Sequence, residues 1–100
     1  MAQIVPAQLN EHNALKLVRD IAADTNNIVI ISHAKKRRKQ RRISRRQIES
    51  CIQKGVITEG PFVNQHGHWQ LNLSRRAAGE EITCVVAIEL AKRLLVITTF

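Results

Sequence analysis

Residues 43–57 read ISRRQIESCIQKGVI, a stretch in which a helix signal gives way to the alternation of a strand. Ser44 and Gln47 have the spacing of a capping box, in which each side chain bonds the backbone N–H of the other residue. The spacing predicts a helix at about residues 45–54. We expect it to end at Gly55, because glycine suits the left-handed conformation that often follows a helix.

The predicted helix has a single apolar face. Ile48, Cys51 and Ile52 recur at helical spacing, which indicates a face turned toward a core. Ile43 precedes the cap, and with Ile48 it has the spacing of a hydrophobic staple, which fixes how the chain enters the helix.

After Gly55 the apolar side chains alternate with polar ones, as in half-buried strands. The predicted strands lie at residues 56–57 and 62–63, on either side of a kink at Gly60-Pro61, and at residues 69–73, 82–90 and 94–100, with a loop at residues 74–80 and a turn near residues 91–93.

Upstream of residue 43, residues 6–25 carry apolar side chains at helical spacing and predict an amphipathic helix. The β-branched run at residues 28–31 is typical of a short buried strand. Ser32 has the chemistry to cap a further helix that starts at His33. The whole order predicts an α+β fold: an N-terminal helix and short strand, then two basic helices packed on a small antiparallel sheet of three to five strands.

Residues 35–46, KKRRKQRRISRR, hold nine of the sixteen Lys and Arg residues of this 100-residue chain, whose formal net charge is +8. No Asp or Glu lies between Asp24 and Glu49, so the run has no neutralising neighbours in the sequence. A break near Arg42 divides the run between two short helices. Cations near a helix N-terminus oppose the helix dipole, at a cost of about 0.3–1 kcal/mol each. The run therefore predicts a surface that an anion stabilises.

Several roles fit such a run: it binds the phosphates of nucleic acid, docks an acidic protein, or serves as a nuclear-localisation or arginine-rich RNA-binding peptide. A charge run is often only a solvated surface, but nine cations without a carboxylate favour a polyanionic partner. The residues that we expect to bind nucleic acid are Lys35, Lys36, Arg38, Lys39, Arg42, Arg45, Arg46, Arg75 and Arg76.

The chain has no tyrosine, and its aromatic residues are Trp69, Phe62 and Phe100. Trp69 belongs to the apolar side of an alternating segment and is expected in the core. Because base stacking needs exposed aromatic rings, this composition predicts a poor stacking surface.

The length and the 44% apolar content predict one domain with a single core. The N-terminus lacks the features of a signal peptide, and no window approaches the roughly 20 apolar residues of a membrane span, which predicts a cytoplasmic protein that does not enter membranes.

Cys51 and Cys84 are expected as buried, reduced thiols. His66-Gly67-His68 has no cysteine or carboxylate nearby, so neither a metal nor another cofactor is predicted. The oligomeric state stays open.

From residue 33 onward the sequence resembles the bacterial domain-of-unknown-function family 4258 (DUF4258). The resemblance rests on the pattern H-A-x-x-R-x-x-x-R-x-I-S, followed by a helix, a glycine and a sheet that closes on an I-T element. It divides the single domain, residues 1–100, into an N-terminal extension at residues 1–32 and a family-like core at residues 33–100. The matching residues are His33, Ala34, Arg37, Arg41, Ile43, Ser44, Ile48, Gly55, Val56, Ile57 and residues 94–98.

The resemblance implies a fold similar to that of the RelE and ParE toxins, in which two helices pack on a small antiparallel sheet. Some toxins of this wider group cleave RNA and others inhibit gyrase, so the fold leaves the activity open. At the matching positions the resemblance implies a site of His33, Arg37 and Arg41. His33 would act as general acid or base in a metal-independent RNA cleavage, and the arginines would hold the phosphate. A structural role for His33 at the start of its helix is an alternative.

Three hypotheses therefore stand, and whether the chain is an enzyme stays open. The first is a toxin-like endoribonuclease that depends on His33. The second is a nucleic-acid-binding module without catalysis, with RNA ranked ahead of DNA as the ligand. The third is a protein-interaction domain whose basic helices dock an acidic partner such as an antitoxin.

Overall fold

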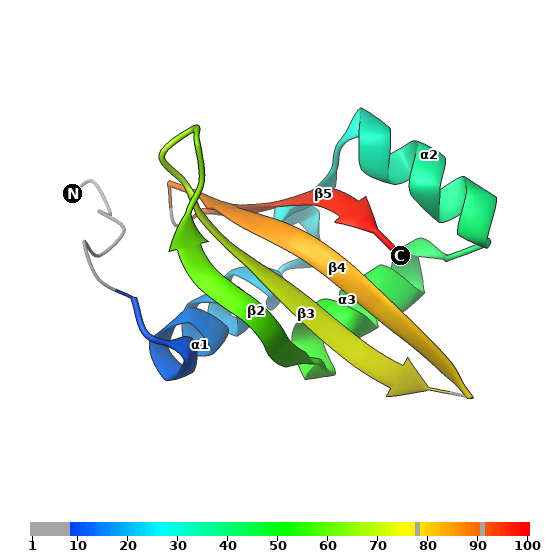
Figure 1. Cartoon of the computed structure of the whole chain (residues 1–100), viewed down its shortest axis with the longest axis horizontal. Coiled ribbons are helices and arrows are strands. Elements are labelled where there is room, and N and C mark those ends of the chain that lie inside the picture. The colour runs from blue at the N-terminus through cyan, green and yellow to red at the C-terminus, as the bar shows by residue number, and fades with distance from the viewer. Residues whose placement is uncertain (1–8, 78, 91) are drawn as a thin grey trace.

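Five strands form one sheet with the order β1-β5-β4-β3-β2 (Figure 1). The structure is a computed structural model that describes residues 9–77, 79–90 and 92–100, apart from the side chain of Arg38. Its elements are α1 (Glu11–Ala22), the 3-10 helix η1 (Thr25–Asn27), β1 (Ile28–Ile30), α2 (Ser32–Arg41), α3 (Arg45–Lys54), β2 (Val56–Val63), β3 (Trp69–Ala77), β4 (Glu80–Glu89) and β5 (Arg93–Thr99).

The sheet is mixed rather than antiparallel throughout. Strands β2 to β5 form the predicted antiparallel meander. β1 runs parallel to β5, with Ile28 opposite Leu94 and Ile30 opposite Val96. Parallel neighbours need a long crossover connection, and here the helices and the meander between β1 and β5 supply it. The predicted α+β class is confirmed. The prediction of a wholly antiparallel sheet is wrong for one strand, because β1 is parallel to β5.

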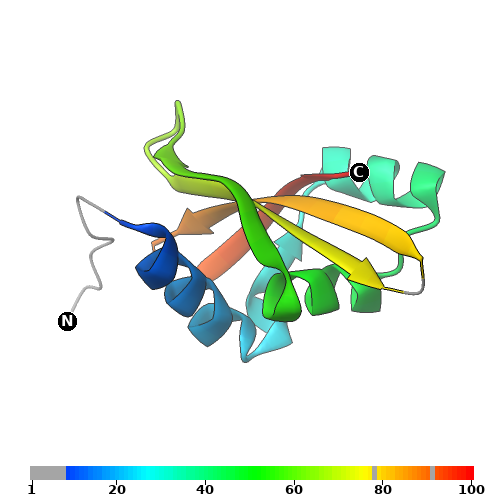
Figure 2. The same ribbon diagram turned by 60° about the horizontal axis from the view of Figure 1, so that its bottom comes forward.

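Helices α1 and α3 lie side by side on one face of the sheet (Figures 1 and 2). α3 turns Ile48, Cys51 and Ile52 toward the strands, and each of these side chains is fully buried, as predicted. α1 adds Val18 and Ile21 to the same core. In the described chain, no helix lies over the opposite face of the sheet, which therefore forms part of the surface (Figure 1).

Helix α2 has a different position from α1 and α3. It lies beside β5 at one end of the sheet (Figure 1). Ala34 is the one side chain of α2 that is buried, among those that the structure describes. Because so little apolar surface is covered, packing contributes little to the stability of this helix.

Helix α1 is shorter than the helix predicted at residues 6–25. The side chain of Asn10 caps its N-terminus, and residues 6–8 lie outside the described chain. At the other end, the carboxylate of Asp24 accepts a hydrogen bond from the N–H of Asn26 at 3.0 Å and starts η1. The predicted C-terminal end is therefore wrong, because this cap favours a separate 3-10 turn.

The predicted cap of α2 is also wrong, because Ser32 is the first residue of the helix. The backbone oxygen of Ile31 accepts the first helical hydrogen bond, from the N–H of Lys35 at 2.9 Å. The N–H of Ile31 still bonds the oxygen of Val96 in β5 at 3.3 Å. The last bond of the sheet and the first bond of the helix thus meet at Ile31.

Gly55 ends α3 in an extended conformation, with φ −73° and ψ 174°, so the predicted left-handed end is wrong. A Cβ atom on Gly55 would lie 2.4 Å from the backbone oxygen of Cys51 and 2.9 Å from that of Ser74. Glycine is required here because the end of α3 approaches β3 closely, not because of its φ angle.

Most of the loop predicted at residues 74–80 belongs to β3. Ser74 pairs with Thr83 and Ala77 pairs with Glu80 across the β3–β4 hairpin. Ser74 is buried, and its Oγ lies 2.7 Å from the Oγ1 of Thr83. The polar residues that suggested a loop instead form a cross-strand hydroxyl pair. The predicted turn at residues 91–93 is shortened by β5, which begins at Arg93; residues 78 and 91 lie outside the described chain.

Candidate nucleic-acid interface

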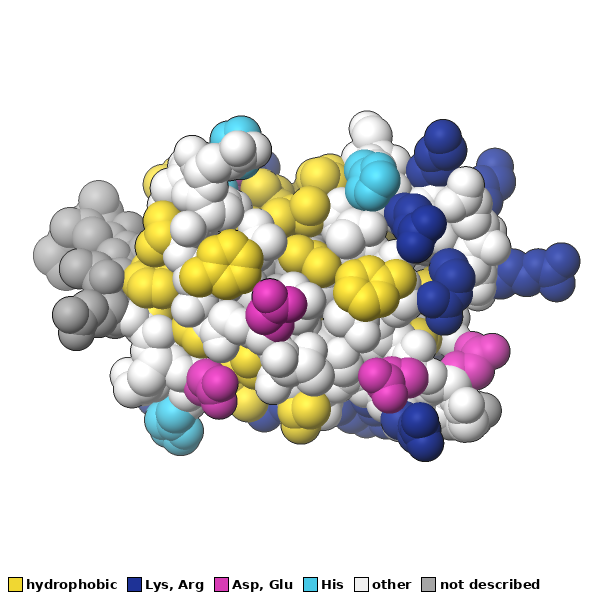
Figure 3. All heavy atoms as spheres, viewed as in Figure 1, with side chains coloured by type: hydrophobic (Ala, Val, Ile, Leu, Met, Phe, Trp, Pro, Cys, Tyr) yellow, Lys and Arg dark blue, Asp and Glu magenta, His cyan; other side chains and the backbone are white. Residues whose placement is uncertain are grey.

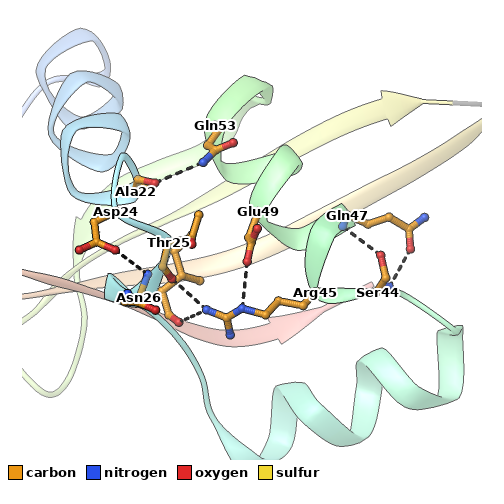
Figure 4. A network of polar contacts seen from close by, with 10 residues as sticks. Ala22, Asp24, Thr25, Asn26, Ser44, Arg45, Gln47, Glu49 and Gln53 are labelled. Atoms are coloured by element: carbon orange, nitrogen blue, oxygen red, sulfur yellow. Dashed lines mark hydrogen bonds and ion pairs between the residues drawn. The ribbon is translucent and has the colours of Figure 1, made fainter.

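The α2–α3 junction, residues 42–44, joins the two basic helices. Arg42 has φ 56°, which breaks the helix where the sequence predicts. Ser44 Oγ accepts a hydrogen bond from the N–H of Gln47 at 3.1 Å, and Gln47 Oε1 accepts one from the N–H of Ser44 at 2.7 Å (Figure 4). The predicted capping box is confirmed. Ile43, between Arg42 and Ser44, is buried in the core and anchors the junction.

Most cations of the basic run have no partner within the part of the chain that the structure describes. Among the side chains that the structure describes, seven make no hydrogen bond or ion pair. Their charges therefore face solvent without an internal counterion, and the side chain of Arg38 lies outside the described part. The seven are Lys35, Lys36, Lys39, Arg41, Arg42 and Arg46, which are exposed, and Arg37, which is half-buried.

Two flanks of α2 carry four of these seven charges. The helical spacing of four places Lys35 and Lys39 on one flank. The buried line through Ala34 separates them from the other flank. On that flank lie His33, Arg37 and Arg41.

A surface hollow of about 430 Å³ lies where the first flank meets the α2–α3 junction. Its lining residues are Lys35, Lys39, Arg42 and Ile43. No carboxylate of the described chain lines it. Three cations around one hollow, with no acidic neighbour, concentrate positive potential there. The geometry suits phosphate groups, because ammonium and guanidinium groups bind phosphate oxygens through charge-assisted hydrogen bonds.

Arg45 belongs to the folded structure. Its Nη2 donates hydrogen bonds to the backbone oxygens of Ile28 at 2.7 Å and Thr25 at 2.9 Å, and its Nε pairs with Glu49 Oε2 at 2.9 Å (Figure 4). These contacts tie the start of α3 to β1. Arg45 is thus engaged by the protein itself, unlike the neighbouring Arg46.

Arg75 and Arg76, which the sequence assigns to the same binding surface, do not line the hollow. As successive residues of β3 they point to opposite faces of the sheet. Arg75 donates a hydrogen bond to Ser50 Oγ on α3, whereas Arg76 pairs with Glu81 at 3.7 Å. Both cations lie near the β3–β4 hairpin and each has a partner within the protein.

His33 is exposed in the first turn of α2. It shares a flank with Arg37 and Arg41, so one helix presents the three residues that the sequence singles out. In the described chain no carboxylate or second histidine bonds its ring. A cleavage that uses both an acid and a base would need a second group besides His33.

Figure 3 shows the helix-free face of the sheet, with Lys and Arg side chains gathered at the end where α2 lies. Hydrophobic side chains are spread over the rest of this face. Trp69 packs against the core, as predicted. Phe62 and Phe100 are instead 42% and 44% exposed, a surface position that the sequence analysis missed. The surface position of Phe62 and Phe100 follows from their register in the strands, and only the folded sheet fixes that register.

Cys51 on α3 and Cys84 on β4 are buried free thiols, as predicted. The thiol of Cys51 donates to the backbone oxygens of Leu73 at 3.3 Å and Ile82 at 3.4 Å. A hydrogen bond from the Cys84 thiol lowers the pKa of Cys51, against the opposing effect of burial. The same hydrogen bond and burial raise the pKa of Cys84. These thiols belong to the core and not to the basic surface.

Within residues 9–77, 79–90 and 92–100, no three His, Cys, Asp or Glu side chains are grouped as a metal site requires. His66 and His68 lie in the β2–β3 turn, where Asn64 Oδ1 accepts hydrogen bonds from their backbone N–H groups at 2.9 and 3.1 Å. None of the helices in the described chain combines the length and the apolar character that crossing a membrane requires.

These features define a small α+β domain: a five-stranded mixed sheet backed by two helices, with a third, strongly basic helix at one end. Residues 30–100 match the family described as Domain of unknown function (DUF4258), and the chain belongs to that family. The match begins three residues before the core that the sequence pattern delimits at residue 33. Searches of curated proteins and of solved structures found no match.

Proposed function

We propose that this protein binds nucleic acid, and RNA in particular, through the basic surface formed by α2 and the α2–α3 junction. The observation that carries the proposal is the hollow lined by Lys35, Lys39 and Arg42, which contains no carboxylate from the described chain. A polyanionic backbone supplies the counterions that these side chains lack among the described residues.

The energetics of α2 support an anionic ligand. Lys35 closes the first turn of the helix, where a cation costs about 0.3–1 kcal/mol against the helix dipole. Lys35 and Lys39 add a like-charge pair at i, i+4, which costs a few tenths of a kcal/mol, on the order of 0.2–0.5. Because α2 buries little more than Ala34, apolar packing does not offset these costs. Phosphates bound along the helix would remove them.

RNA cleavage is a second candidate, and the flank of His33, Arg37 and Arg41 favours it. An exposed histidine with two arginines along one helix is a set that can donate a proton and hold a phosphate. The resemblance of the sequence pattern to a family with a RelE-like and ParE-like fold supports this candidate. We propose that the protein acts in a bacterial cytoplasm, where reduced thiols such as Cys51 and Cys84 persist. In this case RNA is cut without a metal, and cutting is lost in a His33→Ala variant that still binds RNA.

Charge reversal with a matched control tests the binding proposal. The variant Lys35→Glu/Lys39→Glu removes two cations from the hollow, and Lys16→Glu/Lys92→Glu removes two exposed cations from α1 and the β4–β5 turn. Each exchange replaces +1 by −1, so both double variants take the formal net charge from +8 to +4. Affinity for a labelled RNA is measured by fluorescence anisotropy over a series of salt concentrations, in EDTA, with the RNA inspected for cleavage.

We expect the Lys35/Lys39 variant to lose at least about tenfold in affinity and to show a shallower dependence on salt, because fewer counterions are released. The control variant should bind within about threefold of the unchanged protein. Equal losses in both variants would mean that net charge, not the hollow, determines binding. Absence of RNA binding at low salt, with tight binding to an acidic peptide, would replace the proposal with a protein-docking role such as antitoxin binding.

A further inference from the structure

The strand registers identify the side chains on the helix-free face of the sheet. Along β3 and β4, core residues such as Leu71, Leu73 and Cys84 alternate with residues that point the other way. Directly paired residues of antiparallel strands share a face. The residues of the helix-free face therefore include Phe62 with Gln70, Asn72 with Val85 and Thr98, and Thr83 with Phe100.

Phe100 occupies the end of this face that is next to the basic helix. Its N–H donates to the oxygen of Thr83 at 2.9 Å, and its oxygen accepts from the N–H of Thr83 at 2.7 Å, which fixes its side chain on the side of Thr83. The marker C, at this residue, lies close to α2 and the segment that follows it in both ribbon views (Figures 1 and 2). The backbone of Phe100, whose side chain is 44% exposed, thus lies beside the helix that carries the cations.

Charge differs between the two ends of the face. At the β2 end, the carboxylate of Glu59 accepts a hydrogen bond from Asn72 Nδ2 at 3.3 Å, in the same stretch of β2 as Phe62. At the α2 end, the exposed Lys and Arg side chains of α2 itself make no ion pair within the described chain, and the carboxylate of Glu81, on the same face as Thr83, is paired with Arg76 at 3.7 Å. A negatively charged backbone is therefore attracted to the end that holds Phe100 and repelled from the end that holds Phe62.

We propose that the α2 end of the helix-free face binds an unpaired nucleotide of RNA, with its base against the ring of Phe100 and its phosphates on the cations of α2. This inference rests on the proposed function and names its substrate class: single-stranded or looped RNA rather than duplex. An aromatic ring stacks on a base only when the face of that base is free, whereas the bases of a duplex are stacked on one another. The hydroxyl of Thr98, two residues before Phe100 on the same face, offers a hydrogen bond to the edge of such a base.

The test compares two phenylalanines of the same face. Phe100→Ala and Phe62→Ala remove rings of nearly equal exposure, 44% and 42%, from opposite ends. Phe100→Leu keeps apolar bulk without an aromatic face, and Phe100→Trp keeps the aromatic face. Each protein is titrated into a labelled single strand of about 12 nucleotides, a length within the range that one binding groove covers, and into a duplex of the same sequence. A single strand that carries 2-aminopurine reports stacking by its fluorescence.

We expect Phe100→Ala and Phe100→Leu to weaken binding of the single strand about tenfold and to abolish the change in 2-aminopurine fluorescence. Phe62→Ala should change affinity less than about twofold, Phe100→Trp should retain binding, and duplex affinity should be the same in all variants. Salt-dependent binding that none of the Phe100 variants alters would overturn the inference and leave the proposed function standing. If neither RNA binds the unchanged protein at low salt, the proposed function falls and the inference falls with it.

Discussion

Arg45 Nη2 on α3 donates a hydrogen bond of 2.7 Å to the backbone oxygen of Ile28 on β1, seventeen positions earlier in the chain. This bond divides the basic run into two kinds of cation. Arg45 is part of the structure that positions α3, whereas Lys35, Lys39 and Arg42 surround a hollow and have no partner in the described chain. The sequence presents all of them as one run.

Removing Arg45 should affect stability more than removing Arg46. Arg45→Ala leaves the oxygens of Ile28 and Thr25 without their donor, at a cost of about 1 kcal/mol, since the site is partly open to water. Arg46→Ala removes an exposed side chain and should change the free energy of unfolding by less than about 0.5 kcal/mol. Urea unfolding followed by circular dichroism measures both. Equal effects would show that the contacts of Arg45 contribute nothing to the fold.

Ser44 and Ser32 provide a second matched pair. Ser44→Ala removes half of the capping box and should lower the free energy of unfolding by about 1 kcal/mol. Ser32→Ala should have little effect, below about 0.5 kcal/mol, because Ile31 rather than Ser32 accepts the first hydrogen bond of α2. Thermal unfolding of the two variants measures these two changes in the free energy of unfolding. A large loss in Ser32→Ala would contradict the observed start of α2.

Gly55→Ala should be strongly destabilising although its φ of −73° is open to any residue. The new Cβ atom meets the backbone oxygens of Cys51 and Ser74, which cannot rotate away, and we expect a loss of about 1–3 kcal/mol. Gly79→Asn is the control, because this turn residue has φ 79° with open space around it, and asparagine tolerates that conformation. A Gly55→Ala variant as stable as the control would mean that α3 and β3 can move apart freely.

The two thiols give a prediction about ionisation. The hydrogen bond from Cys84 stabilises the thiolate of Cys51 and so lowers its pKa, while burial alone would raise it. In Cys84→Ala that donor is absent and burial remains, so the pKa of Cys51 should rise and its thiolate should appear at higher pH. Thiolate absorbance in the ultraviolet, recorded against pH in the folded protein, measures the change. An unchanged or lower pKa would show that the Cys84 thiol does not control Cys51.

The parts of the fold that depend on neighbouring residues could be predicted from the sequence. The capping box of Ser44 and Gln47, the break at Arg42 and the buried face of α3 follow from spacing along a single helix. The meander follows from alternation with period two. The errors fall where distant segments meet. Gly55 was assigned a left-handed end because the approach of β3 is invisible in the local sequence, and residues 74–77 were assigned to a loop because their partners lie across a hairpin.

The sequence by itself determined that this protein carries nine cations within twelve positions and that they fall on two helices with a break between them. Only the tertiary structure decided which of these cations are engaged by the protein, which line one hollow, and which end of the sheet they share with Phe100. The physical reason is that charge and periodicity are properties of adjacent residues. The partners of a side chain depend instead on backbone groups such as the oxygen of Ile28, which folding brings near from elsewhere in the chain.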